Sequence, residues 1–176
     1  GLAAASRVLR GYNDALAEEC LTYAEALWSE IELENEALRV PLAVELVLAT
    51  RKPEYGAFIG QHANAIAENF EQHGWVVGRA LPWIEDEDFH RKIQAAARAY
   101  SEKIREEEKK TPYGVPYEPD IWGAGWGIQS FGAKQYFLHD AFPELFSRDL
   151  MLNALTFVLG CHPGSNTASF VSGVAA

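Results

Sequence analysis

Apolar residues recur every three or four positions along most of this chain, which is the spacing of one face of an α-helix. The pattern predicts helices over residues 16–31, 40–50, 55–70, 89–104, 128–142 and 150–158, after a shorter one over residues 2–10. No segment shows the strict alternation of apolar and polar residues that is typical of a half-buried strand. The chain is therefore predicted to be all-α.

Helix boundaries are marked by glycine, proline and capping residues. Gly11 separates the first two helices, Asn13 or Asp14 can cap the second, and Pro41 suits the first turn of the third. Residues 73–84 are less regular, because two glycines and a proline there limit any helix to short turns.

Two polar side chains fall on the apolar stripes. Cys20 is predicted to be a small buried residue, and His62, between Phe58 and Ile66, a hydrogen-bonded core histidine. The turns recur as well: an acidic or proline-containing turn followed by an aromatic or leucine anchor stands at 13–16, 52–55, 87–90 and 142–145. Such recurrence indicates stacked helical hairpins, and its irregular spacing favours a toroid with variable loops.

One long loop interrupts the helices, residues 111–127, and it is rich in proline, glycine and aromatic residues. Its rings are Tyr113, Tyr117, Trp122 and Trp126. Aromatic rings on a stiffened backbone suit the flat apolar faces of sugar rings. The same rings could instead fold the loop back onto the core, and the sequence leaves both interpretations open.

Composition and charge narrow the classes of function. The chain has 176 residues, a length typical of one domain, and a net charge of −10 that argues against a nucleic-acid partner. Its one basic cluster, residues 103–110, is interleaved with glutamate and is predicted to be a solvated helix face.

No apolar run reaches the ~18 residues that span a bilayer, so we expect no membrane partner. No metal-binding or cofactor-binding motif occurs, and we expect neither a metal nor a cofactor.

The most specific motif lies near the C-terminus. A predicted helix stops at Gly160, Pro163 follows, and the polar loop ends in Ser-Phe-Val-Ser-Gly at 169–173. The segment FVLGCHPGSNTASFVSG resembles a motif of glycoside hydrolase family 9, approximately Tyr-Ile-Leu-Gly-Arg-Asn-Pro followed by Ser-Phe/Tyr-Val-Thr-Gly. The chain departs from that motif at Cys161, His162 and Ala168.

The resemblance extends over the whole chain. Trp126-Gly127, after the proline-rich loop, is similar to the family's Trp-Gly at a helix start, although Ser130 and Phe131 stand where many of its cellulases carry Arg-Tyr. The segments YNDALAEECLTYAEALW and ELVLATRKPEY resemble the family's Tyr-x-x-Ala-Leu-Ala and Glu-Leu-x-x-Ala-Thr-Gly helices.

The resemblance implies an inverting glycosidase on an (α/α)6 barrel, acting on β-linked glucan-type saccharides and secreted or periplasmic. Inversion needs two carboxylates, and the family's base and acid motifs would lie before and after residues 1–176. We therefore expect the chain to be the middle of the barrel, with no catalytic residue and no activity of its own. It would supply one wall of the cleft and pack against the remaining hairpins of the same domain.

The expected contacts to the carbohydrate substrate are Tyr117, Trp122, Trp126 and Asn166. A sector of a ring would also expose apolar helix faces, which favours association. Two alternatives stay open: a helical-repeat module that binds proteins, and a sugar-binding toroid without catalysis.

Overall fold

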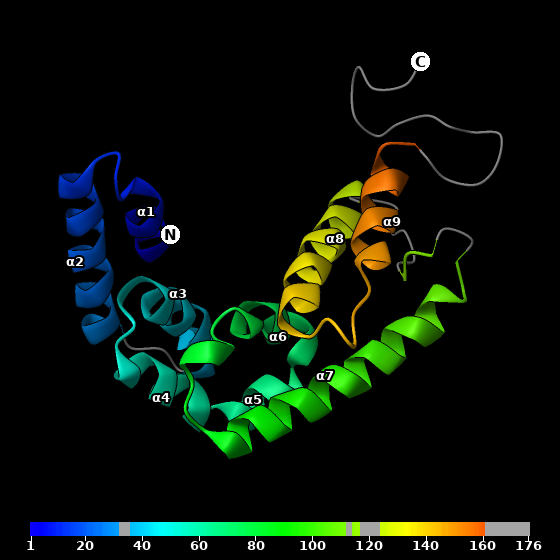
Figure 1. The fold of residues 1–176 in the computed structure, drawn as a ribbon, viewed down its shortest axis with the longest axis horizontal. Coiled ribbons are helices and arrows are strands. Elements are labelled where there is room, and N and C mark those ends of the chain that lie inside the picture. The colour runs from blue at the N-terminus through cyan, green and yellow to red at the C-terminus, as the bar shows by residue number, and fades with distance from the viewer. Residues whose placement is uncertain (32–35, 112–113, 117–123, 161–176) are drawn as a thin grey trace. The chain divides into compact units, whose positions relative to one another are not determined.

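The computed structural model describes residues 1–31, 36–111, 114–116 and 124–160. Within these residues every regular element is a helix and no strand occurs, which confirms the all-α prediction (Figure 1). The chain divides into two compact units, Gly1–Ile93 and Gln94–Ala176. In the part of the chain that the structure describes, no helix is long and apolar enough to cross a membrane.

The first unit consists of short helices that follow one another closely along the chain. They are α1 (Leu2–Leu9), α2 (Asp14–Glu30), the 3₁₀ turn η1 (Glu36–Arg39), α3 (Val40–Thr50), α4 (Pro53–Gln61), α5 (Ala63–Glu68), α6 (Phe70–Gly78) and the 3₁₀ turn η2 (Leu81–Trp83). The first turns of α7 (Glu87–Glu108) complete it, and α7 then continues into the second unit.

Helix α3 forms the centre of the first unit. It contacts α1, α2, α4 and α6, and most of its side chains are buried. Its one acidic residue, Glu45, is held by two cations, Arg7 of α1 and Arg79, each 2.7 Å from a carboxylate oxygen. The charge of Glu45 is therefore compensated beside the apolar core, as a partly buried carboxylate requires.

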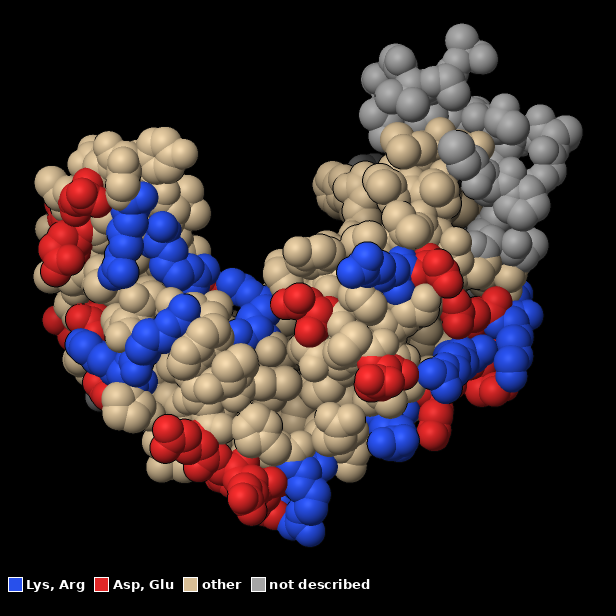
Figure 2. Space-filling view, in the orientation of Figure 1, with Lys and Arg blue, Asp and Glu red and all other residues tan. Residues whose placement is uncertain are grey.

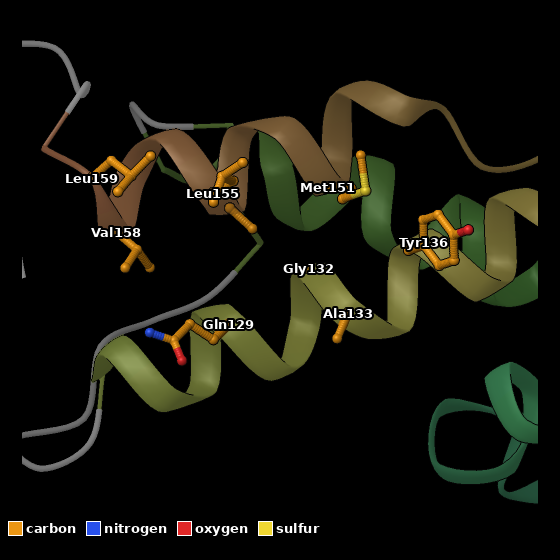
Figure 3. Close-up of a pocket in the computed structure, with 9 residues that line it drawn as sticks. Gln129, Gly132, Ala133, Tyr136, Met151, Leu155, Val158 and Leu159 are labelled. Atoms are coloured by element: carbon orange, nitrogen blue, oxygen red, sulfur yellow. The ribbon is translucent and has the colours of Figure 1, made fainter. Parts of the chain in front are cut away.

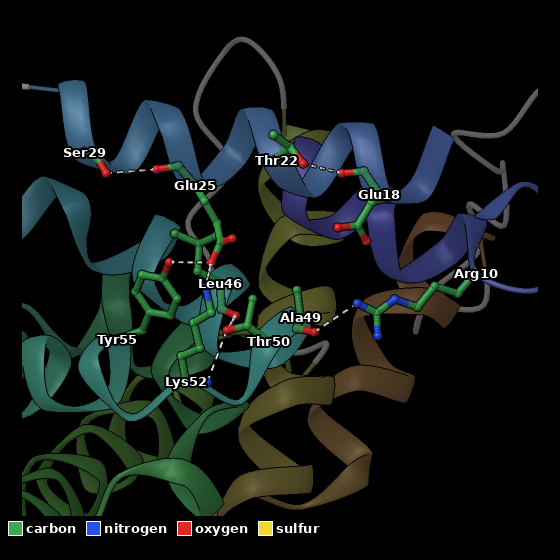
Figure 4. Close-up of polar contacts among 10 residues, drawn as sticks. All are labelled: Arg10, Glu18, Thr22, Glu25, Ser29, Leu46, Ala49, Thr50, Lys52 and Tyr55. Carbon is green, nitrogen blue, oxygen red and sulfur yellow. Dashed lines mark hydrogen bonds and ion pairs between the residues drawn. The ribbon is translucent and has the colours of Figure 1, made fainter. Parts of the chain in front are cut away.

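Polar contacts also join α2 to the turn between α3 and α4 and to the first turn of α4. Glu25 of α2 forms an ion pair with Lys52 and accepts a hydrogen bond of 2.9 Å from the Tyr55 hydroxyl (Figure 4). Arg10, at the end of α1, donates to the main-chain oxygen of Ala49 over 3.4 Å. These contacts fix the α1–α2 hairpin against α3 at several points.

The sequence pattern predicts an apolar stripe on α2 that consists of Leu16, Cys20, Tyr23, Leu27 and Ile31, widened by Ala24 and Trp28, and of these residues only Ala24 is buried. The buried residues of α2 are Ala17 and Ala24, whereas Leu16, Tyr23 and Leu27 are exposed and Cys20 is only half-buried. The prediction was wrong for the large side chains, because alanines allow the closest approach of neighbouring helices and α2 packs through Ala17 and Ala24. The cap at its start is as predicted: Asn13 accepts a hydrogen bond of 3.1 Å from the Leu16 amide.

The single helix predicted over residues 55–70 is divided into α4, α5 and the start of α6. At each break a side chain hydrogen-bonds the carbonyl four residues earlier, His62 to Phe58 and Asn69 to Ala65. Such bonds compete with the helical ladder. The expected bond of His62 is confirmed, although its ring is only half-buried. Residues 73–84 were expected to form only short turns. That prediction was wrong for residues 73–78, which belong to α6.

The second unit contains a helical hairpin. Helices α8 (Ala124–Ala141) and α9 (Arg148–Val158) lie side by side and run in opposite directions (Figures 1 and 3). Ser147 caps α9 by accepting from the Asp149 amide over 3.1 Å. In the connecting turn Phe142 and Phe146 are buried. As predicted, α9 stops just before Gly160, which has a φ of +87°.

Positive and negative side chains alternate along the exposed side of α7 (Figure 2). Lys109 pairs with Glu106 at 2.6 Å, and Lys103 with Glu107 at 3.9 Å. The basic cluster of the sequence is thus a solvated helix face, as predicted.

Candidate functional site

Trp126 stands in the first turn of α8, where the long aromatic loop passes into the helix. The turn is held by Ile128, which belongs to a buried cluster with Val115, Ala154 and Val158. The Trp126 side chain is not part of that cluster and is 76% exposed. Its backbone is therefore fixed by the core while its ring faces outward.

An apolar groove runs between α8 and α9. It has a volume of about 390 Å³ and is lined by Gln129, Gly132, Ala133, Tyr136, Met151, Ala154, Leu155, Val158 and Leu159 (Figure 3). Gly132 forms its floor, where the helices approach so closely that a Cβ on Gly132 would lie 2.9 Å from the Ala154 Cβ.

Trp126 lies in line with this groove. Positions 126, 129, 133 and 136 are separated by three, four and three residues, so they share one face of α8. All four are exposed, with Tyr136 at 55%. Ten residues of helix separate the two rings by about 15 Å along the axis. An exposed aromatic ring thus stands at each end of the α8 side of the groove.

Sequence reasoning missed Tyr136. The signal was present, since Tyr136 follows Trp126 at helical spacing within the helix predicted over residues 128–142, where Gln135 and Leu138 lie on the apolar stripe. Only the burial pattern distinguishes the two faces, with Gln135 and Leu138 buried and Tyr136 exposed.

The groove offers few polar groups. Among the described residues its polar side chains are the Gln129 amide and the Tyr136 hydroxyl, and no carboxylate lines it. The visible face of the α8–α9 hairpin likewise carries few charged side chains (Figure 2). Such a surface can stack and bury a ligand, but these residues supply no acid or base for bond cleavage.

Two described carboxylates of this unit, Glu108 and Asp149, interact where α7 ends and α9 begins. Burial raises the pKa of Glu108 above its ordinary value; the charge of Arg105 opposes that shift and the charge of Asp149 adds to it. Asp149 accepts a hydrogen bond of 3.0 Å from the Ser147 hydroxyl. Neither carboxylate is among the residues that line the groove.

Three of the described histidines are engaged with the backbone. Ring nitrogens of His62, His90 and His139 lie 2.7–2.8 Å from the carbonyl oxygens of Phe58, Ile84 and Phe146. Within the described ranges no group of three His, Cys, Asp or Glu side chains could hold a metal ion.

The other residues predicted from the sequence to contact substrate, Tyr117, Trp122 and Asn166, lie outside the described residues, as do Tyr113, Pro163 and the Ser-Phe-Val-Ser-Gly segment. Of the two interpretations of the aromatic loop, the exposure of Trp126 favours binding over core closure for that one ring.

A comparison of the chain with protein-family models finds no match, and comparisons with curated proteins and with solved structures find none either. The resemblance to glycoside hydrolase family 9 therefore stays a prediction from the motifs quoted above.

Proposed function

We propose that this chain forms one wall of the substrate cleft in an inverting glycoside hydrolase that acts on β-linked glucan-type saccharides. The observation that carries the proposal is the exposed ring of Trp126, fixed at the start of α8 and aligned with Tyr136. A saccharide chain along this face would contact a ring at each end of the groove.

An exposed indole is a ready platform for a sugar. Aromatic side chains bury 150–250 Å² when covered, and the apolar face of a pyranose can cover one side of the ring. At about 25 cal/mol per Å², partial burial of Trp126 against a sugar corresponds to about 1–3 kcal/mol of binding free energy. The Tyr136 hydroxyl and the Gln129 amide can bond the sugar hydroxyls.

Catalysis is assigned to other parts of the same protein. Inversion needs a base that activates water and an acid that protonates the leaving oxygen, with the two carboxyl groups roughly 6.5–9.5 Å apart. In the proposal these carboxylates belong to the remaining hairpins of the barrel, and this chain binds substrate without cleaving it. Secretion or a periplasmic location is part of the same proposal.

Binding of cellotetraose to the chain tests the proposal. In a calorimetric titration, Trp126→Ala is expected to weaken binding by about tenfold or more. Tyr12→Ala is the matched control, because Tyr12 is 91% exposed and lies in the other unit. Equal affinity of the Trp126→Ala variant and the unmodified chain contradicts the role of the ring. Release of reducing sugar by the purified chain contradicts the assignment of catalysis elsewhere.

The apolar lining of the groove favours a second candidate function, a helical-repeat module that binds proteins. Leu155 is 53% exposed at the groove edge, and helix-in-groove contacts use such leucines. In that case cellotetraose would not bind, and Leu155→Glu would abolish a protein contact. A toroid that binds sugar without catalysis would bind cellotetraose through Trp126, but the intact protein would not hydrolyse it.

A further inference from the structure

A second hollow lies in the first unit, between α4 and the segment that leads from η2 into α7. Its volume is about 740 Å³, and the residues that give it its chemistry are Arg51, Gln61, Trp83, Ile84, Glu85 and Asp86. Unlike the α8–α9 groove, it combines apolar and charged side chains in one cavity.

The carboxylate of Asp86 is held in place with one oxygen available. Its Oδ1 accepts a hydrogen bond of 2.9 Å from the Phe89 amide at the start of α7. Its Oδ2 points toward α4, 3.4 Å from the position that a Cβ on Gly60 would occupy. No described residue donates a hydrogen bond to Oδ2. The acceptor is therefore oriented before any ligand arrives, and Gly60 keeps the space beside it open.

Arg51 supplies hydrogen-bond donors to the same cavity. Its guanidinium lies 3.7 Å from the centre of the Trp83 ring, so the ring orients the plane of its N–H groups. Among the described residues Arg51 has no ion-pair partner and donates no hydrogen bond. Its backbone adopts a φ of +61° at the end of α3, where glycine is the preferred residue. An arginine in this conformation is strained. A glycine would relieve the strain but would not provide the guanidinium.

These groups define the class of ligand. A stacked guanidinium, an oriented carboxylate oxygen and the Gln61 amide can donate to and accept from hydroxyl groups, while the half-buried ring of Trp83 offers apolar contact. The lining residues also include four carboxylates, at positions 85–88, against the single cation of Arg51. An acidic sugar would therefore be repelled.

We propose that this cavity is a binding site for an uncharged saccharide, separate from the α8–α9 groove. The class of ligand is the one proposed for Trp126, and in that respect the inference rests on the proposed function. The location of the site and the identity of its binding residues do not depend on the proposed function.

Two variants test the site without disturbing the fold. Asp86→Asn keeps an oxygen that can cap α7 but replaces the free acceptor by an amide donor. Arg51→Gly removes the guanidinium at a position where glycine suits the backbone. Glu54→Gln is the matched control for Asp86→Asn. It also removes one negative charge, but Glu54 lies in α4 and does not line the cavity. Circular dichroism and thermal unfolding confirm that each variant is folded.

The measurement is a titration of the ¹⁵N-labelled chain with cellotetraose, followed by NMR. The amides of Gly56 and Gly60 report on this cavity, and those of Gly125 and Gly127 report on Trp126. We expect shifts at Gly56 and Gly60 that saturate, at least about tenfold weaker binding there in Asp86→Asn and Arg51→Gly, and unchanged binding in Glu54→Gln. Tetragalacturonate, an acidic saccharide, is expected to produce no shifts at these glycines.

The outcomes separate this inference from the proposed function. Shifts at Gly56 and Gly60 that survive Trp126→Ala and are lost in Asp86→Asn support the second site, even if the glycines beside Trp126 do not respond. Shifts confined to Gly125 and Gly127 overturn the second site and leave the proposed function standing. Absence of any shift, or equal binding of tetragalacturonate, overturns the inference.

Discussion

Gly56 of α4 lies directly against the main-chain oxygen of Trp83: a Cβ at Gly56 would stand 2.5 Å from that oxygen. The contact joins α4 to η2 and forms one end of the cavity in the first unit. Because the neighbour is backbone, it cannot move away as the end of a flexible side chain could. Only glycine permits this approach.

We therefore expect Gly56→Ala to destabilise the first unit by about 1–3 kcal/mol, the usual cost of overpacking. Gly60→Ala is the control in the same helix, because its Cβ would have only an ordinary contact, 3.4 Å from Asp86 Oδ2. There the better helix propensity of alanine should stabilise the chain by about 0.5–1 kcal/mol. Urea unfolding followed by circular dichroism measures both. Equal stability of the two variants would show that α4 and η2 are not in close contact.

The helix positions could be predicted from the sequence where local signals agreed with packing. Pro41 and the apolar run after it predicted residues 40–50, and α3 covers those residues. Nothing in the sequence marks Arg51 as the left-handed residue that ends α3, because glycine is the usual signal. The breaks at His62 and Asn69 were missed because an unbroken apolar stripe crosses them.

Burial was harder to predict than helix position. In α2 the predicted stripe included Leu16, Tyr23 and Leu27, which are exposed, whereas the buried residues are Ala17 and Ala24. Hydrophobicity alone does not show whether the face with large apolar side chains or the face with small ones is buried. For the same reason the cavity beside Trp83 had no sequence signal, since it depends on Gly56, Gly60 and Asp86 meeting in space.

Gly132 has the corresponding role in the second unit. A Cβ there would lie 2.9 Å from that of Ala154, so Gly132→Ala should separate α8 from α9 and cost about 1–3 kcal/mol. In Gly125→Ala, the control in the same helix, the new methyl group meets no atom of the described residues within 4 Å. That variant should be at least as stable as the unmodified chain. The free energy of unfolding in urea distinguishes them, and a stabilising Gly132→Ala would contradict the close packing of the hairpin.

The Glu25 contacts predict a pH dependence. The hydrogen bond from Lys52, and then that from Tyr55, hold the pKa of Glu25 below its ordinary value near 4.5. Because the folded-state pKa is lowered, this stabilisation is complete above the unfolded value and is lost as the pH falls through the folded one. Glu25→Gln should therefore lower the melting temperature at pH 7, by an amount that shrinks as the pH falls below about 4.5.

The effect is modest, at most about 1 kcal/mol, because the Glu25 side chain is partly exposed. Thermal unfolding of both proteins between pH 3 and pH 7 provides the test, with Glu19→Gln as a control on an exposed acid of the same helix. A difference between Glu25→Gln and the unmodified chain that stays constant over this range would exclude the ionised carboxylate as its cause.

Gln135 is fully buried in α8, and neither its side-chain oxygen nor its side-chain nitrogen has a hydrogen-bond partner among the described residues. Burying an amide without partners costs about 1–3 kcal/mol. Gln135→Met keeps the length of the side chain and removes the polar atoms, so it should raise the free energy of unfolding by about that amount. Gln129→Met, at an exposed position of the same helix, should change it by less than about 0.5 kcal/mol. If Gln135→Met instead destabilises the chain, the amide has partners in solution, and the glutamine contributes to stability.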